Sequence, residues 1–277
     1  MLNMLATTAI VKRALEEDLG PGDLTSSALF TPAERGQGEI LARQEGVIAG
    51  LPVAGLAFQM LPPGGKFIPL VTEGNRVAAG QGVARVEGPL VAILGAERVA
   101  LNFLQRLSGI ATLTARYVER VKPYQAKICD TRKTVPGLRL LDKYAVRLGG
   151  GVNHRLNLGD AVLLKDNHIK TAGSIMAAVT RARRVIPLTT KIEVEVENLA
   201  QVEEALAARA DIIMLDNMEP EEMRRAVELV GGRALVEASG GITLDRVADV
   251  AATGVDYISV GALTHSVTAL DLSLELC

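Results

Sequence analysis

From Ala126 onward, the chain alternates short apolar runs with helical patterns, and this repeat constrains the fold more than any other feature. The last four runs begin at residues 191, 211, 234 and 256, which are 20 to 23 residues apart. Regular alternation of this kind predicts parallel strands joined by crossover helices. The predicted strands cover residues 126–130, 160–165, 191–196, 211–216, 234–238 and 256–260, and the predicted helices cover about 139–148, 172–185, 199–209, 220–230 and 243–253.

The chain before this repeat has a different pattern. Residues 4–19 have apolar positions at helical spacing, and a Gly-Pro-Gly-Asp segment ends that helix. Residues 36–88 consist of short apolar or alternating runs cut by glycines, which indicates β-strands and tight turns. Residues 89–121 have a long helical pattern, with breaks expected at Gly95 and Gly109. We therefore expect a β-layer with helices ahead of the repeat.

The composition excludes several classes of protein. A net charge of −2 argues against general nucleic-acid binding, which needs a broad basic field. Two cysteines, Cys129 and Cys277, form no disulfide framework, so we expect a reducing, cytoplasmic environment. No apolar run reaches the ~18 residues that a membrane span requires. The expected partners are therefore neither nucleic acid nor membrane.

Residues 127–170 are basic in an otherwise balanced chain. This segment holds nine Lys or Arg and four acidic residues. Its cations come in short groups, such as Arg132-Lys133 and His154-Arg155, rather than along one helix face. Groups of this kind suit the ends of strands, where a few cations can converge on one anion. The segment therefore predicts a small, highly anionic substrate.

Polar and charged residues crowd the same end of every predicted strand. In parallel βα barrels, the carboxyl ends of the strands form the active face, so this pattern predicts an enzyme. The residues at these ends include Asp130, Arg132, Lys133, Lys165, Glu195, Asp216, Glu237, Ser239 and Gly261.

The segment Lys-Ile-Glu-Val-Glu-Val-Glu at 191–197 alternates carboxylates with apolar residues. A period of two places Glu193, Glu195 and Glu197 on one face of a strand, which in a barrel points inward. Buried carboxylates need a partner or a metal ion, and Lys165, Lys191 and a divalent cation are available here. The alternative is an edge strand with a solvated acidic face.

The segment from Ala238 to Leu244 (Ala-Ser-Gly-Gly-Ile-Thr-Leu) joins a predicted strand to a predicted helix. Its glycines let the backbone approach a ligand, and free N–H groups at a helix start bind anions. Phosphate sites in barrels often follow the last strands, although a simple tight turn gives the same sequence. Together, a phosphate site, carboxylates and a cation cluster suit a phosphorylated, metal-bound sugar and a second substrate with carboxylates.

Several motifs closely resemble the quinolinate phosphoribosyltransferase family. They are DTRKTVPGLRLLDKYAVRLGGGVNHR, LLKDNH, IEVEVEN, DIIMLDNM, VEASGGI and YISVGALTHS, preceded by GDLTSS, GVIAGLP and ERVALNFLQRLSGIAT. The resemblance covers essentially the whole chain. A related paralogue associated with molybdenum transport shares part of these motifs, and the segment from Lys165 to His168 separates the two. A non-catalytic anion sensor with the same fold is a further alternative.

The resemblance implies a type II phosphoribosyltransferase-like α/β fold in two domains. Residues 1–108 would form an N-terminal α/β sandwich, with the tail 264–277 packed on it, and residues 109–263 an open, irregular parallel α/β barrel. The family works as a homodimer or a higher assembly of dimers. Arg98 would then reach the site of the neighbouring subunit.

The resemblance also implies the reaction: transfer of the phosphoribosyl group of phosphoribosyl pyrophosphate to quinolinate, with loss of CO2. Mg²⁺ would be the cofactor, held by Glu195 and Asp216 directly or through water. Lys133, Lys165, Glu195 and Asp216 would be the catalytic residues. The substrate-binding residues would be Arg98, Arg132, Lys133, His154, Arg155, Lys165, Glu195, Asp216, Ser239, Gly240, Gly241 and Gly261.

Overall fold

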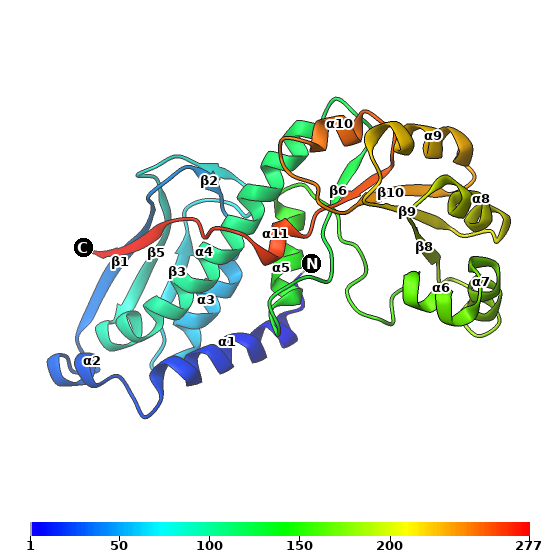
Figure 1. The fold of residues 1–277 in the computed structure, drawn as a ribbon. Helices are drawn as coiled ribbons and strands as arrows, with labels where there is room; N and C mark the ends of the chain where they lie inside the picture. The colour runs from blue at the N-terminus through cyan, green and yellow to red at the C-terminus, as the bar shows by residue number, and fades with distance from the viewer. Residues whose placement is uncertain (1) are drawn as a thin grey trace. The chain divides into compact units, whose positions relative to one another are not determined.

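The computed structural model describes residues 2–277, which form two compact units (Figure 1). The first unit combines the chain up to Ala115 with residues 134–150 and 263–277. The second combines residues 116–133 and 151–262. Within residues 2–277, no helix is both long and apolar enough to cross a membrane.

The first unit is built on an antiparallel sheet with strand order β12-β1-β5-β3. Helix α3 packs on β3, and α1 packs on α3, so helices cover one face of this sheet. The elements are α1 (Met4–Leu19), α2 (Leu24–Leu29), β1 (Arg35–Ala42), β2 (Gly46–Val47), α3 (Leu51–Met60), β3 (Lys66–Pro69), β4 (Arg76–Val77), β5 (Gly82–Pro89), α4 (Leu90–Val121), α5 (Arg139–Leu148) and β12 (Leu272–Leu276). This arrangement is the predicted α/β sandwich.

Two predictions for this part of the chain are wrong. Helix α3 interrupts the region that was expected to contain only strands and turns; its N-terminal turn holds a proline, and it buries Phe58. Helix α4 runs unbroken through both expected breaks. A Cβ at Gly95 would lie 2.7 Å from a Leu61 methyl carbon, and one at Gly109 would lie 2.3 Å from the Thr268 carbonyl oxygen. These glycines permit close packing rather than ending a helix.

The second unit contains a six-stranded parallel sheet with order β6-β11-β10-β9-β8-β7. Its end strands are β6 and β7, so the predicted open parallel α/β barrel is confirmed. The elements are β6 (Lys127–Cys129), β7 (Val162–Leu164), α6 (Asp166–Ala172), α7 (Ile175–Arg183), β8 (Ile192–Val196), α8 (Leu199–Ala207), β9 (Ile212–Asp216), α9 (Pro220–Val230), β10 (Leu235–Ser239), α10 (Val247–Ala251) and β11 (Tyr257–Ser259). The next helix, α11 (Ala262–His265), has its first residue in this unit and the other three in the first unit. Helix α6 was not predicted.

Helix α5 belongs to the first unit. The domain boundary at residues 108/109, which the family resemblance implies, would place this helix in the second unit. Its buried Asp142 accepts two hydrogen bonds from Arg106 of α4, at 3.0 and 2.8 Å. Its Tyr144 hydroxyl donates to the carboxylate of Glu73. The last strand, β12, pairs antiparallel with β1. The units are therefore defined by these contacts and not by two continuous stretches of sequence.

Candidate active site

A cavity of about 600 Å³ opens in the second unit, at the carboxyl ends of the parallel strands. Each strand ends in a residue or short loop that faces this space, because parallel strands all end at the same edge of the sheet. The lining residues are Thr131, Arg132, Lys133, His154, Arg155, Leu163, Lys165, Glu195, Met214, Asp216, Asn217, Glu237, Ser239, Gly240, Gly241 and Ser259.

Ten of the twelve site residues predicted from the sequence line this one cavity. They are Arg132, Lys133, His154, Arg155, Lys165, Glu195, Asp216, Ser239, Gly240 and Gly241. The other two lie elsewhere. Arg98 is an exposed residue of α4 in the first unit, and Gly261 follows β11, next to α11.

The carboxylates of β8 separate into three environments. Glu193 is 2% exposed, Glu195 lines the cavity, and Glu197 lies beyond the strand and is exposed. Strand β8 lies between β9 and β7, so the alternative of an edge strand does not hold. The Lys165 ammonium nitrogen lies 2.5 Å from Oε2 of Glu195, whereas Lys191 is exposed. Lys165 is therefore the partner of Glu195.

Lys165 is held where β7 passes into α6. It is the N-cap residue of that helix, and its backbone N–H donates to Nδ1 of His168 at 3.0 Å. His168 therefore has a local role in the turn that aims the lysine. Helix α6 could not be recognised from its residue pattern, because seven residues are too few for a clear apolar period.

The imidazole of His154 is fixed on several sides. Asp130, which is fully buried, accepts from the backbone N–H of His154 at 3.0 Å and from the Asn153 amide at 2.6 Å. Nε2 of His154 lies 2.9 Å from Oε2 of Glu193 and 3.6 Å from Oε2 of Glu237. Sequence reasoning assigned no role to Glu237, although its place two residues before Ser239 put it on the inward face of its strand.

Burial and mutual repulsion perturb the charges beneath the cavity. Burial, and then the nearby charge of Glu193, raise the pKa of Glu237 to about 7. Burial, and then the positive charge of Arg132, lower the pKa of the Arg155 guanidinium. Two like-charged guanidinium groups held near one another favour an anion between them, so this wall of the cavity suits carboxylates.

The turn after β10 requires glycine. Gly240 has φ +92°, and a Cβ there would lie 2.2 Å from Oδ1 of Asn217. Gly241 has φ +57°, and a Cβ there would meet no atom within 4 Å, so this backbone faces open space. Asn217 itself has φ +54°, and its backbone N–H donates to the Ser239 carbonyl at 3.0 Å. Two adjacent strand ends therefore form one exposed backbone edge that a phosphate can approach.

Two sets of residues have the chemistry of a metal site. Glu195 and Asp216 come from adjacent strands and line the cavity, and carboxylate oxygens are the ligands that Mg²⁺ prefers. His154, Glu193 and Glu237 also lie close enough to hold an ion. However, Nδ1 of His154 accepts a hydrogen bond from the Arg155 N–H at 2.8 Å, so the imidazole proton is on Nε2, facing the carboxylates. The second set therefore holds a proton where a metal ion would bind.

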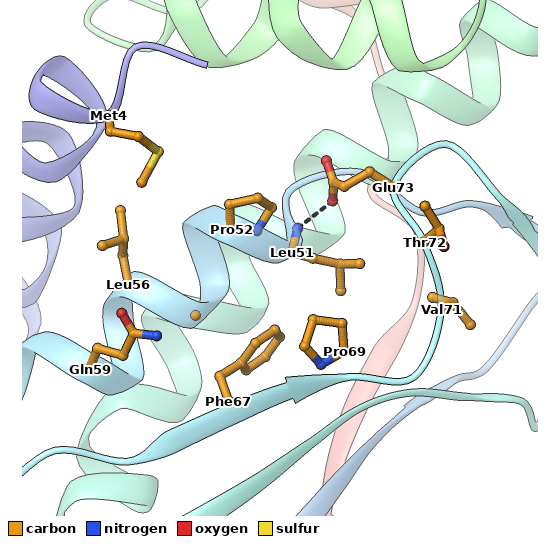
Figure 2. A pocket seen from close by; sticks show the side chains of 11 residues that line it. Met4, Leu51, Pro52, Leu56, Gln59, Phe67, Pro69, Val71, Thr72 and Glu73 are labelled. Atoms are coloured by element: carbon orange, nitrogen blue, oxygen red, sulfur yellow. Dashed lines mark hydrogen bonds between the residues drawn. The ribbon is translucent and has the colours of Figure 1, made fainter. Parts of the chain in front are cut away.

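A second cavity, of about 500 Å³, lies in the first unit and has a different character. Figure 2 shows Met4, Leu56 and Phe67 around it, with the Glu73 carboxylate turned toward the backbone of Leu51. Oε1 of Glu73 accepts from the N–H groups of Gly50 and Leu51, at 2.8 and 2.6 Å. The Glu73 carboxylate is therefore occupied by structural hydrogen bonds. The other side chains that line this cavity are mostly apolar.

Comparison with known proteins agrees with these observations. The model of the quinolinate phosphoribosyl transferase N-terminal domain matches residues 23–108, and the model of the C-terminal domain matches residues 110–275. The structure of NadC from Streptococcus pyogenes superposes with a TM-score of 0.96 at 43% identity, covering 100% of this chain and 98% of that one. The nicotinate-nucleotide pyrophosphorylase from Francisella tularensis also gives a TM-score of 0.96, at 40% identity, with the same two coverages.

Two bacterial relatives match over almost their whole length. The probable nicotinate-nucleotide pyrophosphorylase (carboxylating) of Bacillus subtilis is 45% identical over 275 residues, which cover 99% of this chain and 95% of that protein. The nicotinate-nucleotide pyrophosphorylase (carboxylating) of Mycobacterium leprae is 44% identical over 272 residues, covering 96% and 95%. With both domain models matched, the chain belongs to the quinolinate phosphoribosyl transferase family.

Proposed function

We propose that this protein transfers the phosphoribosyl group of phosphoribosyl pyrophosphate to quinolinate, releasing pyrophosphate and CO2 and giving nicotinate mononucleotide for de novo NAD biosynthesis. One observation carries the proposal. A single cavity combines a cationic wall, two carboxylates on adjacent strands and a glycine turn with exposed backbone. These three parts match a dicarboxylate, a ribose and a phosphate, and the family relationship supports the same reaction.

The cationic wall binds quinolinate. Arg132 and Arg155 present planar donors to its two carboxylates, since guanidinium groups pair carboxylates with two parallel hydrogen bonds. His154 completes this wall, on the side where Asp130 and Glu193 hold it. Arginine here is more suitable than lysine because its charge persists when it is partly buried.

The remaining site residues bind the phosphoribosyl donor. Ser239, Gly240, Gly241 and Gly261 hold the 5′-phosphate through backbone and hydroxyl donors. Glu195 and Asp216 accept from the ribose hydroxyls and hold Mg²⁺, directly or through water. When bound, that ion would supply positive charge that stabilises the departing pyrophosphate. Lys133 and Lys165 add ammonium charges for the same leaving group.

The reaction then follows from placement and electrostatics. The bond between C1 of the ribose and the pyrophosphate oxygen breaks, and C1 becomes oxocarbenium-like next to Glu195 and Asp216. The ring nitrogen of quinolinate attacks C1, which makes a cationic pyridinium. As CO2 leaves, the electron pair of the carbon–carboxylate bond stays on the ring carbon, where the adjacent positive nitrogen stabilises it, and a proton then bonds to that carbon. The side chains act by positioning and charge, without a covalent intermediate on the protein.

We also propose a homodimer, or a higher assembly of such dimers, in which Arg98 enters the site of the neighbouring subunit. Its exposed place on α4 supports this proposal. An Arg98→Ala chain mixed with a Lys165→Ala chain tests it. If Arg98 acts across the interface, the mixed dimer recovers one working site of two; no recovery places Arg98 in its own chain. A reducing, cytoplasmic location is the matching expectation for Cys129 and Cys277.

The central test is an assay of the purified protein with quinolinate, phosphoribosyl pyrophosphate and MgCl2. We expect release of CO2 together with nicotinate mononucleotide. Turnover with another acceptor but not with quinolinate would identify a paralogue such as the molybdenum-associated one. Tight quinolinate binding without product, unaffected by Lys133→Ala, would identify an anion sensor.

A further inference from the structure

We propose that Glu193 is a positioning residue of this site, acting through His154 to fix the backbone and side chain of Arg155. The inference rests on the proposed function, in which Arg155 binds a carboxylate of the substrate. Glu193 does not line the cavity, and it contacts the proposed substrate site through His154. Its effect must therefore pass through the imidazole.

Glu193 is itself rigidly placed. It is the second residue of β8, between Ile192 and Val194, which are both fully buried. Its own exposure is 2%, and strands on both sides hold the backbone of β8. A carboxylate held in this way cannot move to accommodate His154, so the imidazole must orient itself toward the carboxylate. Its oxygen Oε2 lies 2.9 Å from Nε2 of His154.

The imidazole passes this constraint on to the next residue. Nδ1 of His154 accepts a hydrogen bond from the backbone N–H of Arg155 at 2.8 Å, so Nε2 carries the proton of the neutral ring and donates to Glu193. Both ring nitrogens are thus engaged at once. The ring holds one orientation and one tautomer, and the position of the Arg155 backbone follows from them.

Arg155 is also anchored at its other end. Its Nη1 donates to the carbonyl of Ala161 at 3.1 Å, while the guanidinium lines the cavity. With the backbone N–H held by His154 and one guanidinium nitrogen held by Ala161, the remaining donors point in a set direction. This is the preorganisation that binding a planar carboxylate requires.

The cost of this arrangement indicates a function beyond folding. Oε1 of Glu193 and Oε1 of Glu237 are both buried, and neither has a hydrogen-bond partner among the described residues. Unsatisfied buried carboxylate oxygens oppose folding, and an apolar side chain on β8 would avoid that loss. The compensating gain is an acceptor placed so that it selects the Nε2–H tautomer of His154.

Two substitutions of Glu193 and one control substitution beyond the end of β8 test the proposal. Glu193→Leu removes the acceptor, and we expect the KM for quinolinate to rise about tenfold, a factor that corresponds to about 1.4 kcal/mol. The KM for phosphoribosyl pyrophosphate should change less than about twofold, because Glu193 contacts His154 of the quinolinate wall, whereas Glu195 of the same strand is held by Lys165. Glu193→Gln keeps an oxygen that accepts from Nε2–H, so this variant should restore most of the quinolinate affinity. Glu197→Gln, in an exposed residue just beyond the strand, is the matched control and should behave as wild type.

A second measurement does not depend on turnover. The chain has three histidines, so one His154→Asn variant assigns the His154 signals in a long-range ¹H–¹⁵N spectrum of the side chains. We expect the Nε2–H tautomer in the wild type and in Glu193→Gln, and a mixture of tautomers or a charged ring in Glu193→Leu.

The two experiments separate failure of this inference from failure of the proposed function. A wild-type protein without activity on quinolinate would overturn the function, while the tautomer would still report on the Glu193 contact. An Nδ1–H tautomer in the wild type would overturn the inference even if Glu193→Leu fails to fold. Equal increases of both KM values would also overturn it, since they indicate general damage to the site.

Discussion

Asp142 and Glu73 of the first unit are more completely hydrogen-bonded than Glu193 and Glu237 of the second unit. In the first unit, Asp142 accepts from Arg106 twice and from a backbone N–H, and Glu73 accepts from two backbone N–H groups and a tyrosine hydroxyl. In the second unit, Glu193 and Glu237 each keep one oxygen without a partner among the described residues. The first pair of carboxylates connects helices and strands of the fold. The second pair lies at or beneath the cavity, where incomplete hydrogen bonding is compatible with a functional role.

The largest effect should come from breaking the pair in the first unit. Arg106→Ala leaves the charge of Asp142 buried without its partner, and Asp142 is fully inaccessible to water. We expect a loss of about 3 to 5 kcal/mol in the free energy of unfolding, measured by urea denaturation. Adding Asp142→Leu should recover part of it, because the uncompensated charge is then gone. A loss below about 1 kcal/mol in Arg106→Ala would show that the Arg106–Asp142 pair contributes little to the stability of the first unit.

The pair in the cavity should behave in the opposite way. Lys165 is 47% exposed as a side chain, so Lys165→Met should change stability by less than about 1 kcal/mol. The same change should lower kcat/KM by about 100-fold or more, since it removes a charge next to the leaving group. Steady-state kinetics and thermal unfolding give the two values. Lys191→Met, at an exposed lysine that does not line the cavity, is the control and should leave both unchanged.

The pH dependence of stability should show the proton on Glu237. Its pKa in the folded protein is raised from 4.5 to about 7, so the folded state keeps this proton longer than the unfolded state. The protonated carboxyl therefore makes its full contribution to the free energy of unfolding below pH 4.5. This contribution, on the order of 3 kcal/mol in total, is lost as the pH rises through about 7.

Glu237→Gln mimics the protonated form and should not show this loss. We expect the variant to gain stability relative to wild type between pH 5 and pH 8, as measured by chemical denaturation across that range. A difference that stays constant with pH would mean that Glu237 is ionised throughout, and it would remove the distinction drawn between the two units.

The smallest effect should come from one hydrogen bond of a well-satisfied carboxylate. Tyr144→Phe removes the hydroxyl that donates to Glu73, while two backbone donors remain. We expect a loss of about 1 kcal/mol in the free energy of unfolding. Tyr124→Phe, at a tyrosine that is 41% exposed, is the matched control and should have no measurable effect. A loss as large as that of Arg106→Ala would show that Glu73 depends on this hydroxyl alone.

Much of the second unit could be predicted because its pattern is regular. All six strands lie within the predicted ranges or one residue beyond them, and ten of the twelve site residues line one cavity. The family and fold predictions are confirmed. Strand ends that share one edge of a sheet make such predictions possible, since position along the repeat fixes position in space.

The remaining features depend on contacts between distant residues. Gly109 reads as a helix break in isolation, and only the carbonyl of Thr268 explains why glycine lies inside a continuous helix. Helix α5 follows the repeat by its sequence, yet Arg106 and Glu73 hold it in the first unit. The roles of Glu193 and Glu237 needed the orientation of His154, which no local pattern specifies. Arg98 stays a prediction until a partner subunit is examined.

The pairing of β1 with β12 has a consequence for how the chain folds during synthesis. Gly38 pairs with Leu276, so the sheet of the first unit contains a strand made at the other end of the chain. All strands of the second unit are translated between these two. A ribosome therefore completes the parallel sheet before the antiparallel sheet can gain its last strand, and early-made segments such as β1 must wait with an unpaired edge. The sheet that begins first in the sequence is therefore the last to have all its strands available.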